Sequence, residues 1–282
     1  DHIIYAAVSG FGCYGPKSLR PGYDIIAQAT GGLMSITGEP GRHGIRVGNA
    51  MGDVLGGMNL TIGILIALHA RTITGKGQRV DVSLVDSVVS SLETGTQRYF
   101  ASGKQPELMG NRYAAAYPYD SFKASDGFFV IGCGNDKLFS LFCNNVLNRP
   151  ELLEDSRFAT NIKRCEYHAE LKPIIEEWSI NYSIDEAVDL LNEAGVPAAP
   201  INDLQRVTED DHIANVREMF VPLNHPIIGD MKVNGNPVKL LDTKADISRP
   251  APALGQDNGE VYKSLLGFDE SFLEKLKEDK II

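Results

Sequence analysis

The sequence predicts an α/β protein, in which helices and strands form a doubly wound sheet in a large domain and a small α+β domain follows it. Strands and helices alternate up to about Ala101, and such alternation is typical of a sheet covered by helices. After Gly103 the pattern changes to a hairpin followed by amphipathic helices. The length of 282 residues exceeds what one hydrophobic core usually organises and allows one or two domains.

The elements of the first part follow from periodicity. Strict alternation over Arg79–Leu84 marks a strand, and the apolar run from Val54 to Ala70 is helical. In chain order we expect a strand ending at Val8, a helix near 23–34, a helix from Asp53 to about Arg71, a strand at 79–84 and a helix at 86–101. Lys76 and the glycines of the Thr74–Gln78 loop could cradle a phosphate. However, this loop lacks the Walker spacing and precedes a strand, which favours a structural turn.

After Gly103, turn and helix-capping residues mark more clearly where the strands and helices begin and end. Asp126 and Gly127 suit a tight turn between strands at 119–123 and 128–133. Asn135 is expected to cap a helix, and Ser183 with Glu186 forms a capping box for a helix that ends at Gly195. The predicted segments are 1–110 for the large domain, 111–205 for the small domain and 206–282 for a linker that returns to the large domain, with a final helix after Asp269.

Composition excludes several function classes. The formal net charge is −10, with both signs interspersed and no basic stripe, so nucleic acid is not an expected partner. The four cysteines form no CxxC pair and have no metal-ligand spacing to the six histidines, which predicts reduced thiols, a cytoplasmic location and no metal. The longest apolar run, Thr61–Ala70, is too short to cross a bilayer, and no secretory signal is visible, so no membrane association is expected.

Asp53 is the most informative residue. It lies among Gly48, Gly52, Gly56 and Gly57, where a bare backbone lets a bulky ligand approach closely. A reactive carboxylate would suit this position. The alternative is that Asp53 only caps the helix that follows, since aspartate is a favoured N-cap residue.

The chain as a whole resembles the class III CoA-transferase family, which includes formyl-CoA transferases and carnitine and bile-acid CoA-transferases. Each of the matching motifs is weak alone, but together they occur in the order expected of the family. They are SGFG at 9–12, PGYD at 21–24, Gly52-Asp53, TGKGQ at 74–78, GNR at 110–112, Ser125-Asp126-Gly127, Gly195-Val196-Pro197, His225-Pro226 and PALGQ at 252–256.

The resemblance implies a Rossmann-like large domain, an interlocked homodimer and transfer of CoA from an acyl-CoA to a carboxylic acid. Asp53 would be the nucleophile, through aspartyl anhydride and aspartyl-CoA thioester intermediates. Tyr23 and Asp24 would bind the acceptor carboxylate or orient Asp53, and Ser9 and Leu84 would contact CoA. CoA thioesters would be substrates, with no permanently bound cofactor. Family members carry a nucleotide-fold half before the SGFG strand, and that half is expected to be missing here.

The sequence departs from the family in the loop that closes over the intermediate. Ala114, Ala115 and Ala116 stand where many members have a run of glycines, as in relatives that use acetyl-CoA or succinyl-CoA with oxalate or other dicarboxylates. Two alternatives remain. An α-methylacyl-CoA racemase needs a second base, for which this chain has Tyr23 in place of histidine. A non-catalytic CoA-binding subunit would have a degraded Asp53 neighbourhood, which is not observed.

Overall fold

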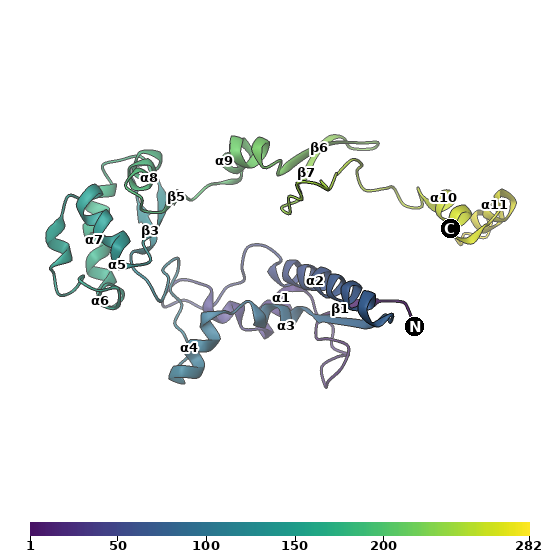
Figure 1. Ribbon diagram of the computed structural model, residues 1–282, viewed down its shortest axis with the longest axis horizontal. Helices are drawn as coiled ribbons and strands as arrows, with labels where there is room; N and C mark the ends of the chain where they lie inside the picture. The colour runs from purple at the N-terminus through teal and green to yellow at the C-terminus, as the bar shows by residue number, and fades with distance from the viewer. The chain divides into compact units, whose positions relative to one another are not determined.

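The computed structural model describes residues 1–282, which form two compact units, residues 1–200 and residues 201–282 (Figure 1). The first unit holds two sheets, a parallel pair β1-β2 and an antiparallel sheet of order β3-β4-β5. The second unit holds one antiparallel hairpin, β6-β7. The mixture of one parallel pair, antiparallel hairpins and helices confirms the predicted α/β class. The predicted boundary near residue 110 stays a prediction.

In the beginning of the first unit, β1 and β2 pair in parallel, with Ala7 opposite Asp81. The long helix α2 packs against both strands and against α1 and α3. The elements are β1 (Tyr5–Ser9), α1 (Asp24–Thr30), a 3₁₀ turn (Leu33–Ile36), α2 (Met51–Thr74), β2 (Arg79–Ser83), α3 (Leu84–Ser90) and α4 (Thr94–Ser102).

Two helices in this region differ from the prediction. The helix expected at 23–34 stops at Thr30, because Gly31 ends it and Gly32 has a φ of 88°. The single helix expected at 86–101 is two helices, α3 and α4, separated at Glu93, whose φ is 47°. The turn reading of Thr74–Gln78 is confirmed, since Gly75 caps the end of α2 with a φ of 69°.

Helix α2 is longer than the apolar run suggested. It extends over 24 residues with a mean hydropathy of 1.6 in its most apolar window, which by length and composition alone suffices to cross a membrane. The expectation that no segment is long enough was therefore wrong, because the helix continues beyond the run on both sides. The helix contacts two strands and two helices, and 17% of this apolar window is buried.

The rest of the first unit encloses an aromatic core. The hairpin β3 (Tyr119–Lys123) and β4 (Phe128–Gly132) forms as predicted, and β5 (Ala198–Pro200) adds to β4. The helical elements are α5 (Asp136–Leu141), a π-helical turn (Phe142–Val146), a 3₁₀ turn (Pro150–Leu153), α6 (Asn161–Glu166), α7 (His168–Ser179) and α8 (Ile184–Glu193). Fully buried phenylalanines from β3, β4, α5 and the turns, such as Phe122, Phe129 and Phe142, fill the core between sheet and helices.

The helix caps predicted for this region are confirmed. The Asn135 side chain accepts a hydrogen bond from the Leu138 backbone N–H at 2.9 Å and so caps α5. Ser183 and Glu186 form the predicted capping box of α8, and Gly195, with a φ of 79°, follows its end. Local sequence chemistry therefore determines where these helices begin and end.

The second unit begins with α9 (Leu204–Glu209) and a π-helical turn (His212–Val216). The hairpin β6 (Phe220–His225) and β7 (Gly229–Asn234) follows, and the unit ends with α10 (Asn258–Leu266) and α11 (Glu270–Glu278). Asp269 caps α11 by accepting from the Phe272 N–H at 2.8 Å, which confirms the predicted final helix.

Candidate active site

Gln28 on α1 has a fully buried side chain, and its hydrogen bonds connect α1 to the segment that leads into α2. Its amide nitrogen donates to both carboxylate oxygens of Asp24, at 2.9 and 3.1 Å, and to the backbone carbonyl of Asn49 at 3.2 Å. Its amide oxygen accepts from the Val47 N–H at 2.9 Å. One side chain thus holds both the acidic residue of α1 and the segment that leads into α2.

Asp24 extends this network into the first turn of α2. Its Oδ1 accepts a hydrogen bond from the Gly52 N–H at 2.8 Å, which satisfies one of the donors that every helix leaves free at its start. The two helices approach closely at this point, because a Cβ on Gly52 would lie 3.2 Å from the Cβ of Ala27. Asp24 therefore serves as a cap supplied from outside the helix.

Asp53 follows Gly52 directly and lies in the first turn of α2. Its side chain is exposed and makes no hydrogen bond or ion pair with the chain. The capping interpretation of Asp53 is wrong, because the cap position belongs to Ala50 and no side chain caps the helix from there. The positive end of the helix dipole stabilises the Asp53 carboxylate while leaving both of its oxygens free.

From the sequence, Tyr23 and Asp24 shared two expected roles, which are to bind the acceptor carboxylate and to orient Asp53. In the structure the two side chains differ. Asp24 has both oxygens engaged by Gln28 and Gly52, and this arrangement fits orienting the Asp53 segment better than binding an acceptor acid. Tyr23 is the N-cap residue before α1, is 79% exposed and has a free side chain. The assignment of the acceptor carboxylate to Tyr23 stays a prediction.

Ser9 and Leu84, predicted to contact CoA, lie at the ends of the parallel strands. Ser9 is the last residue of β1, and its hydroxyl is buried without a hydrogen-bond partner. A buried hydroxyl without a partner is costly, and ligands of open α/β sheets bind at the carboxyl ends of the strands, so a ligand partner fits this hydroxyl. Leu84 is only 9% exposed, and a Cβ on Gly56 would lie 2.5 Å from its Cδ2. Both CoA contacts stay predictions, and Leu84 has little surface to offer a ligand.

We did not assign a role to Gln28 from the sequence, although this side chain orders the amino-terminal end of α2. One signal was available, since Gln28 stands four residues after Asp24 and therefore on the same side of α1. Its partners on Val47 and Asn49 are backbone groups, and such partners carry no mark in the sequence.

The alanine loop that replaces the glycine run is tied to α6. The Asn161 side chain donates to the Ala115 carbonyl at 2.8 Å and accepts from the Tyr117 N–H at 3.1 Å. Ala116 is buried at 6% exposure. The loop is thus fixed at its carboxyl-terminal end by a specific clamp.

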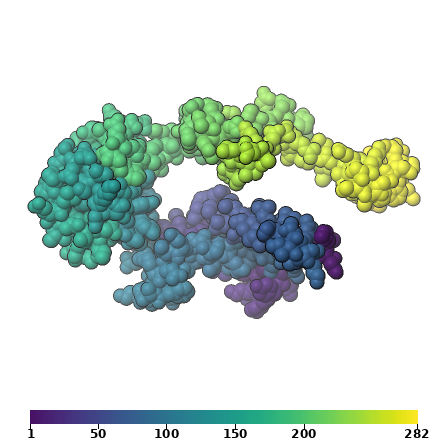
Figure 2. All heavy atoms as spheres, in the orientation of Figure 1, coloured from purple at the N-terminus to yellow at the C-terminus, as the bar shows by residue number.

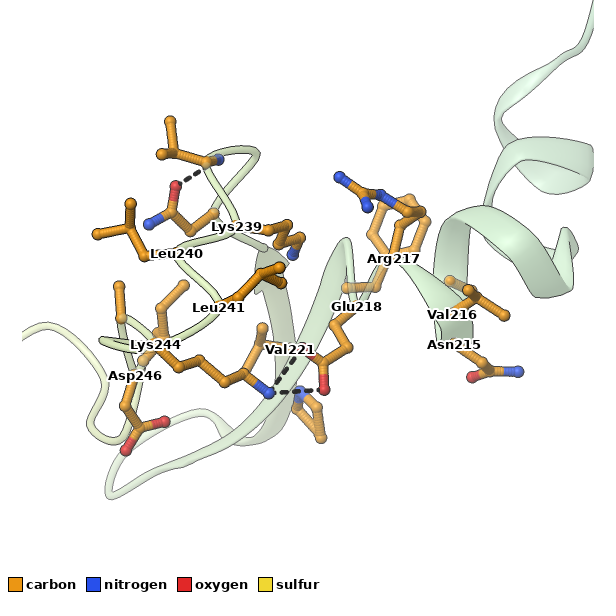
Figure 3. A pocket seen from close by; sticks show the side chains of 17 residues that line it. Asn215, Val216, Arg217, Glu218, Val221, Lys239, Leu240, Leu241, Lys244 and Asp246 are labelled. Carbon is orange, nitrogen blue, oxygen red and sulfur yellow. Dashed lines mark hydrogen bonds and ion pairs between the residues drawn. The ribbon is translucent and has the colours of Figure 1, made fainter.

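A separate hollow of about 590 Å³ lies within the second unit, between the 212–216 turn, β6 and the segment 236–247 (Figure 3). Lys244 points to Glu218 and pairs with both of its carboxylate oxygens at 2.8 and 2.9 Å (Figure 3). Leu240 and Leu241 are mainly exposed along its edge. Arg217 and Lys239 also line this hollow, beside the ion pair of Lys244 with Glu218.

Comparison with known proteins places the chain in a family. The family model described as CoA-transferase family III matches residues 1–258. The chain is 35% identical to the succinyl-CoA:glutarate CoA-transferase of Mus musculus, over 98% of this chain and 63% of the relative. It is 37% identical to the acetyl-CoA:oxalate CoA-transferase of Acetobacter aceti, over 93% of this chain and 66% of the relative. The chain therefore spans about two thirds of the length of these relatives.

A solved structure agrees with these relatives. The crystal structure of a CAIB/BAIF family protein from Brucella suis matches with a TM-score of 0.78 and 34% identity, covering 94% of this chain and 68% of the other. The resemblance that the ordered motifs indicated is thus confirmed in both sequence and fold. The chain belongs to CoA-transferase family III.

Proposed function

We propose that this chain carries the reactive carboxylate of a CoA-transferase, which moves CoA from an acyl-CoA donor to a dicarboxylic acid acceptor. The observation that carries the proposal is Asp53, an exposed carboxylate with no partner in the first turn of α2. A nucleophile has to be free of competing bonds and held in place, and the Asp24–Gln28 network holds the backbone beside it. The relatives whose names specify glutarate and oxalate support a dicarboxylate acceptor.

The first half of the reaction transfers CoA to Asp53. A carboxylate oxygen of Asp53 attacks the thioester carbonyl of the donor, the C–S bond breaks, and a mixed anhydride and CoA thiolate form. The thiolate then attacks the aspartyl carbonyl of the anhydride and releases the donor as its carboxylate. The product is an aspartyl-CoA thioester, so the energy of the original thioester is retained.

The second half transfers CoA to the acceptor. The acceptor carboxylate attacks the aspartyl thioester, which expels CoA thiolate and gives a second anhydride. The thiolate attacks the acceptor carbonyl of that anhydride, which yields the new acyl-CoA and returns Asp53 as a carboxylate. In the first turn of α2 the N–H groups of Met51, Gly52 and Val54 already donate within the chain. The N–H of Asp53 itself is then the first-turn donor for the oxyanions that form on the aspartyl carbon.

Substituting Asp53 tests this proposal. In a panel of acetyl-CoA and succinyl-CoA donors against oxalate, glutarate and other acids, Asp53→Asn should lower turnover by about a thousandfold or more. Asp86→Asn is a matched control, since Asp86 is likewise exposed in the first turn of the neighbouring helix α3, and it should retain turnover. Equal losses in both variants, or full activity of Asp53→Asn, would contradict a nucleophilic role. Binding of CoA without any transfer would instead indicate a non-catalytic subunit.

Tyr23 separates transfer from racemisation. A racemase needs two groups that exchange protons at the α carbon, and a tyrosine hydroxyl holds its proton near neutral pH. Incubation with a 2-methylacyl-CoA in deuterated water should therefore leave the α carbon unlabelled. Exchange at a rate that matches turnover would favour the racemase.

The interlocked homodimer and the cytoplasmic location belong to the same proposal. A dimer predicts a sedimenting species of twice the chain mass of 30.7 kDa. A purely monomeric protein with transferase activity would contradict the interlocked assembly. Fractionation of the cells that produce the protein tests its location.

A further inference from the structure

A second cavity lies in the first unit, and its lining includes three basic side chains. Its volume is about 750 Å³, and its walls come from α4, the segment 104–115 and α6. The basic residues are Arg98 on α4, Lys104 just after α4, and Arg112 beside the alanine loop. A volume of this size is typical of cavities that bind small molecules.

The three basic side chains have no carboxylate partner. Of the two acidic residues in the lining, Glu166 is already paired with Lys163 at 2.8 Å, which leaves Glu107 as the one unpaired acid. An excess of positive charge is therefore concentrated here in a chain whose net charge is −10. Exposed lysines and arginines are common, but a convergent set around one cavity attracts anions more strongly than single charges do.

Among the three basic residues, Arg112 is the strongest evidence for a bound anion, because this residue is half-buried. Charged groups that leave water normally have an ion pair or a ligand, and Arg112 has no ion-pair partner in the chain. Its positive charge acts on the thiol of Cys165, a half-buried neighbour in the same lining, and opposes the rise in the pKa of this thiol that burial causes. Arg112 and Cys165 both line the cavity, and Cys165 belongs to α6.

The remaining lining suits a ligand with an uncharged part. Ala101, Met109 and Ile162 supply apolar surface between the basic residues. Asn161 holds the Ala115 carbonyl in the wall and so fixes the backbone there. The cavity therefore combines a fixed wall, apolar surface and three free cations.

We propose that Arg98, Lys104 and Arg112 form an anion-binding site for a small molecule that carries at least two negatively charged groups, either phosphates or carboxylates. Arginine donates two parallel hydrogen bonds to either group, and the lysine adds a point charge. The site does not depend on the reaction at Asp53, since none of its residues takes part in that chemistry.

Calorimetry with the full chain tests the site, using inorganic pyrophosphate as one probe and glutarate as the other. Binding of pyrophosphate alone would identify a phosphate site, and binding of glutarate alone a dicarboxylate site. Arg112→Gln and Arg98→Gln should each weaken the bound probe by about tenfold or more, the loss of a charge-assisted hydrogen bond. Lys232→Gln removes one exposed positive charge from β7, outside the cavity, and should leave affinity unchanged.

A second readout does not depend on any variant. The bound anion should slow alkylation of Cys165, which lines the cavity, and leave the exposed Cys13 unaffected. The Asp53→Asn variant should still bind the probe, so that failure of the transfer proposal leaves this result intact. If neither probe binds, or if Lys232→Gln weakens binding as much as Arg112→Gln, the proposed site is refuted.

Discussion

The region 117–196 and the region 1–110 differ in how far their apolar side chains are buried. In 117–196, nineteen buried residues form one continuous core between the β3-β4-β5 sheet and its helices. In 1–110, the packed cluster contains Ala27, Leu84 and Val88, and the long helix α2 exposes apolar side chains along its length. These include Val54, Met58, Ile62, Leu65 and Ile66.

This difference shows what holds the candidate active site. In the colours of Figure 2, residues 1–110 run from purple to blue and residues 117–196 run from teal to green. Parallel strands are normally covered on both faces, and the β1-β2 pair has α2 and its neighbours as the contacts that the chain supplies. The end of α2 that carries Asp53 is therefore ordered by the hydrogen bonds of Gln28 and Asp24 more than by a large core.

The largest expected difference between the two regions is in thiol labelling. Burial raises the pKa of the Cys133 and Cys143 thiols to about 12, from 9.0. Since the thiolate is the reactive form, labelling of the folded protein at neutral pH should be slower by on the order of a thousandfold than for an ordinary thiol. Cys13 is exposed and should label first. Mass spectrometry after timed alkylation checks this, and fast native labelling of Cys133 would contradict a closed core.

Truncating the core of the 117–196 region should have the largest effect on stability. Phe129 is fully buried on β4, so Phe129→Ala should lower the free energy of unfolding by about 3 kcal/mol or more. Phe128 precedes it on the same strand and is 53% exposed, which makes Phe128→Ala a matched control with a small effect. Urea unfolding measures both variants. Equal losses would mean that the strand faces are assigned wrongly.

Removing the polar network should have an intermediate effect on stability and a clear one on activity. Gln28→Leu leaves the Val47 N–H and the Asn49 carbonyl without their partner, which should cost about 2 kcal/mol. Turnover should fall as well, because the segment beside Asp53 loses its support. Gln97→Leu, at an exposed position of α4, is the control and should change neither property. Normal activity in a folded Gln28→Leu protein would contradict the positioning role.

Disrupting one helix cap should have the smallest effect. Ser183→Ala removes the side-chain cap of α8 and should cost about 1 kcal/mol. The pKa of Glu186 is lowered mainly by its hydrogen bond from the Ser183 backbone and also by the Ser183 hydroxyl. A lowered pKa contributes stability that is present above the unfolded-state pKa and lost as the pH falls through the folded-state pKa. The difference between wild type and variant should thus shrink in acid, and a difference that grows there would oppose this account.

Local signals in the sequence predicted the helix ends well where one side chain caps its own helix. Asn135, Ser183 and Asp269 each accept a backbone hydrogen bond three residues ahead, so the information lies within one turn. The break between α3 and α4 was missed, because the residue at the break, Glu93, gives no glycine or proline signal for its positive φ.

The candidate site was predictable in part. The glycine setting and the motif order located Asp53, which has the free carboxylate that its role requires. The division of roles between Tyr23 and Asp24 was not predictable, because it depends on Gly52 lying within hydrogen-bond distance of a residue 28 positions earlier. Long-range contacts of backbone groups leave no periodic pattern that a sequence can show.

The covalent state of Asp53 during turnover decides whether this residue is the nucleophile. The protein should be incubated with acyl-CoA alone, treated with borohydride or hydroxylamine, digested and analysed by mass spectrometry. We expect a modified peptide that contains Asp53, since both reagents trap an aspartyl thioester or anhydride. The same peptide from Asp53→Asn protein should be unmodified. An unmodified Asp53 peptide in protein that turns over at the full rate would contradict the account.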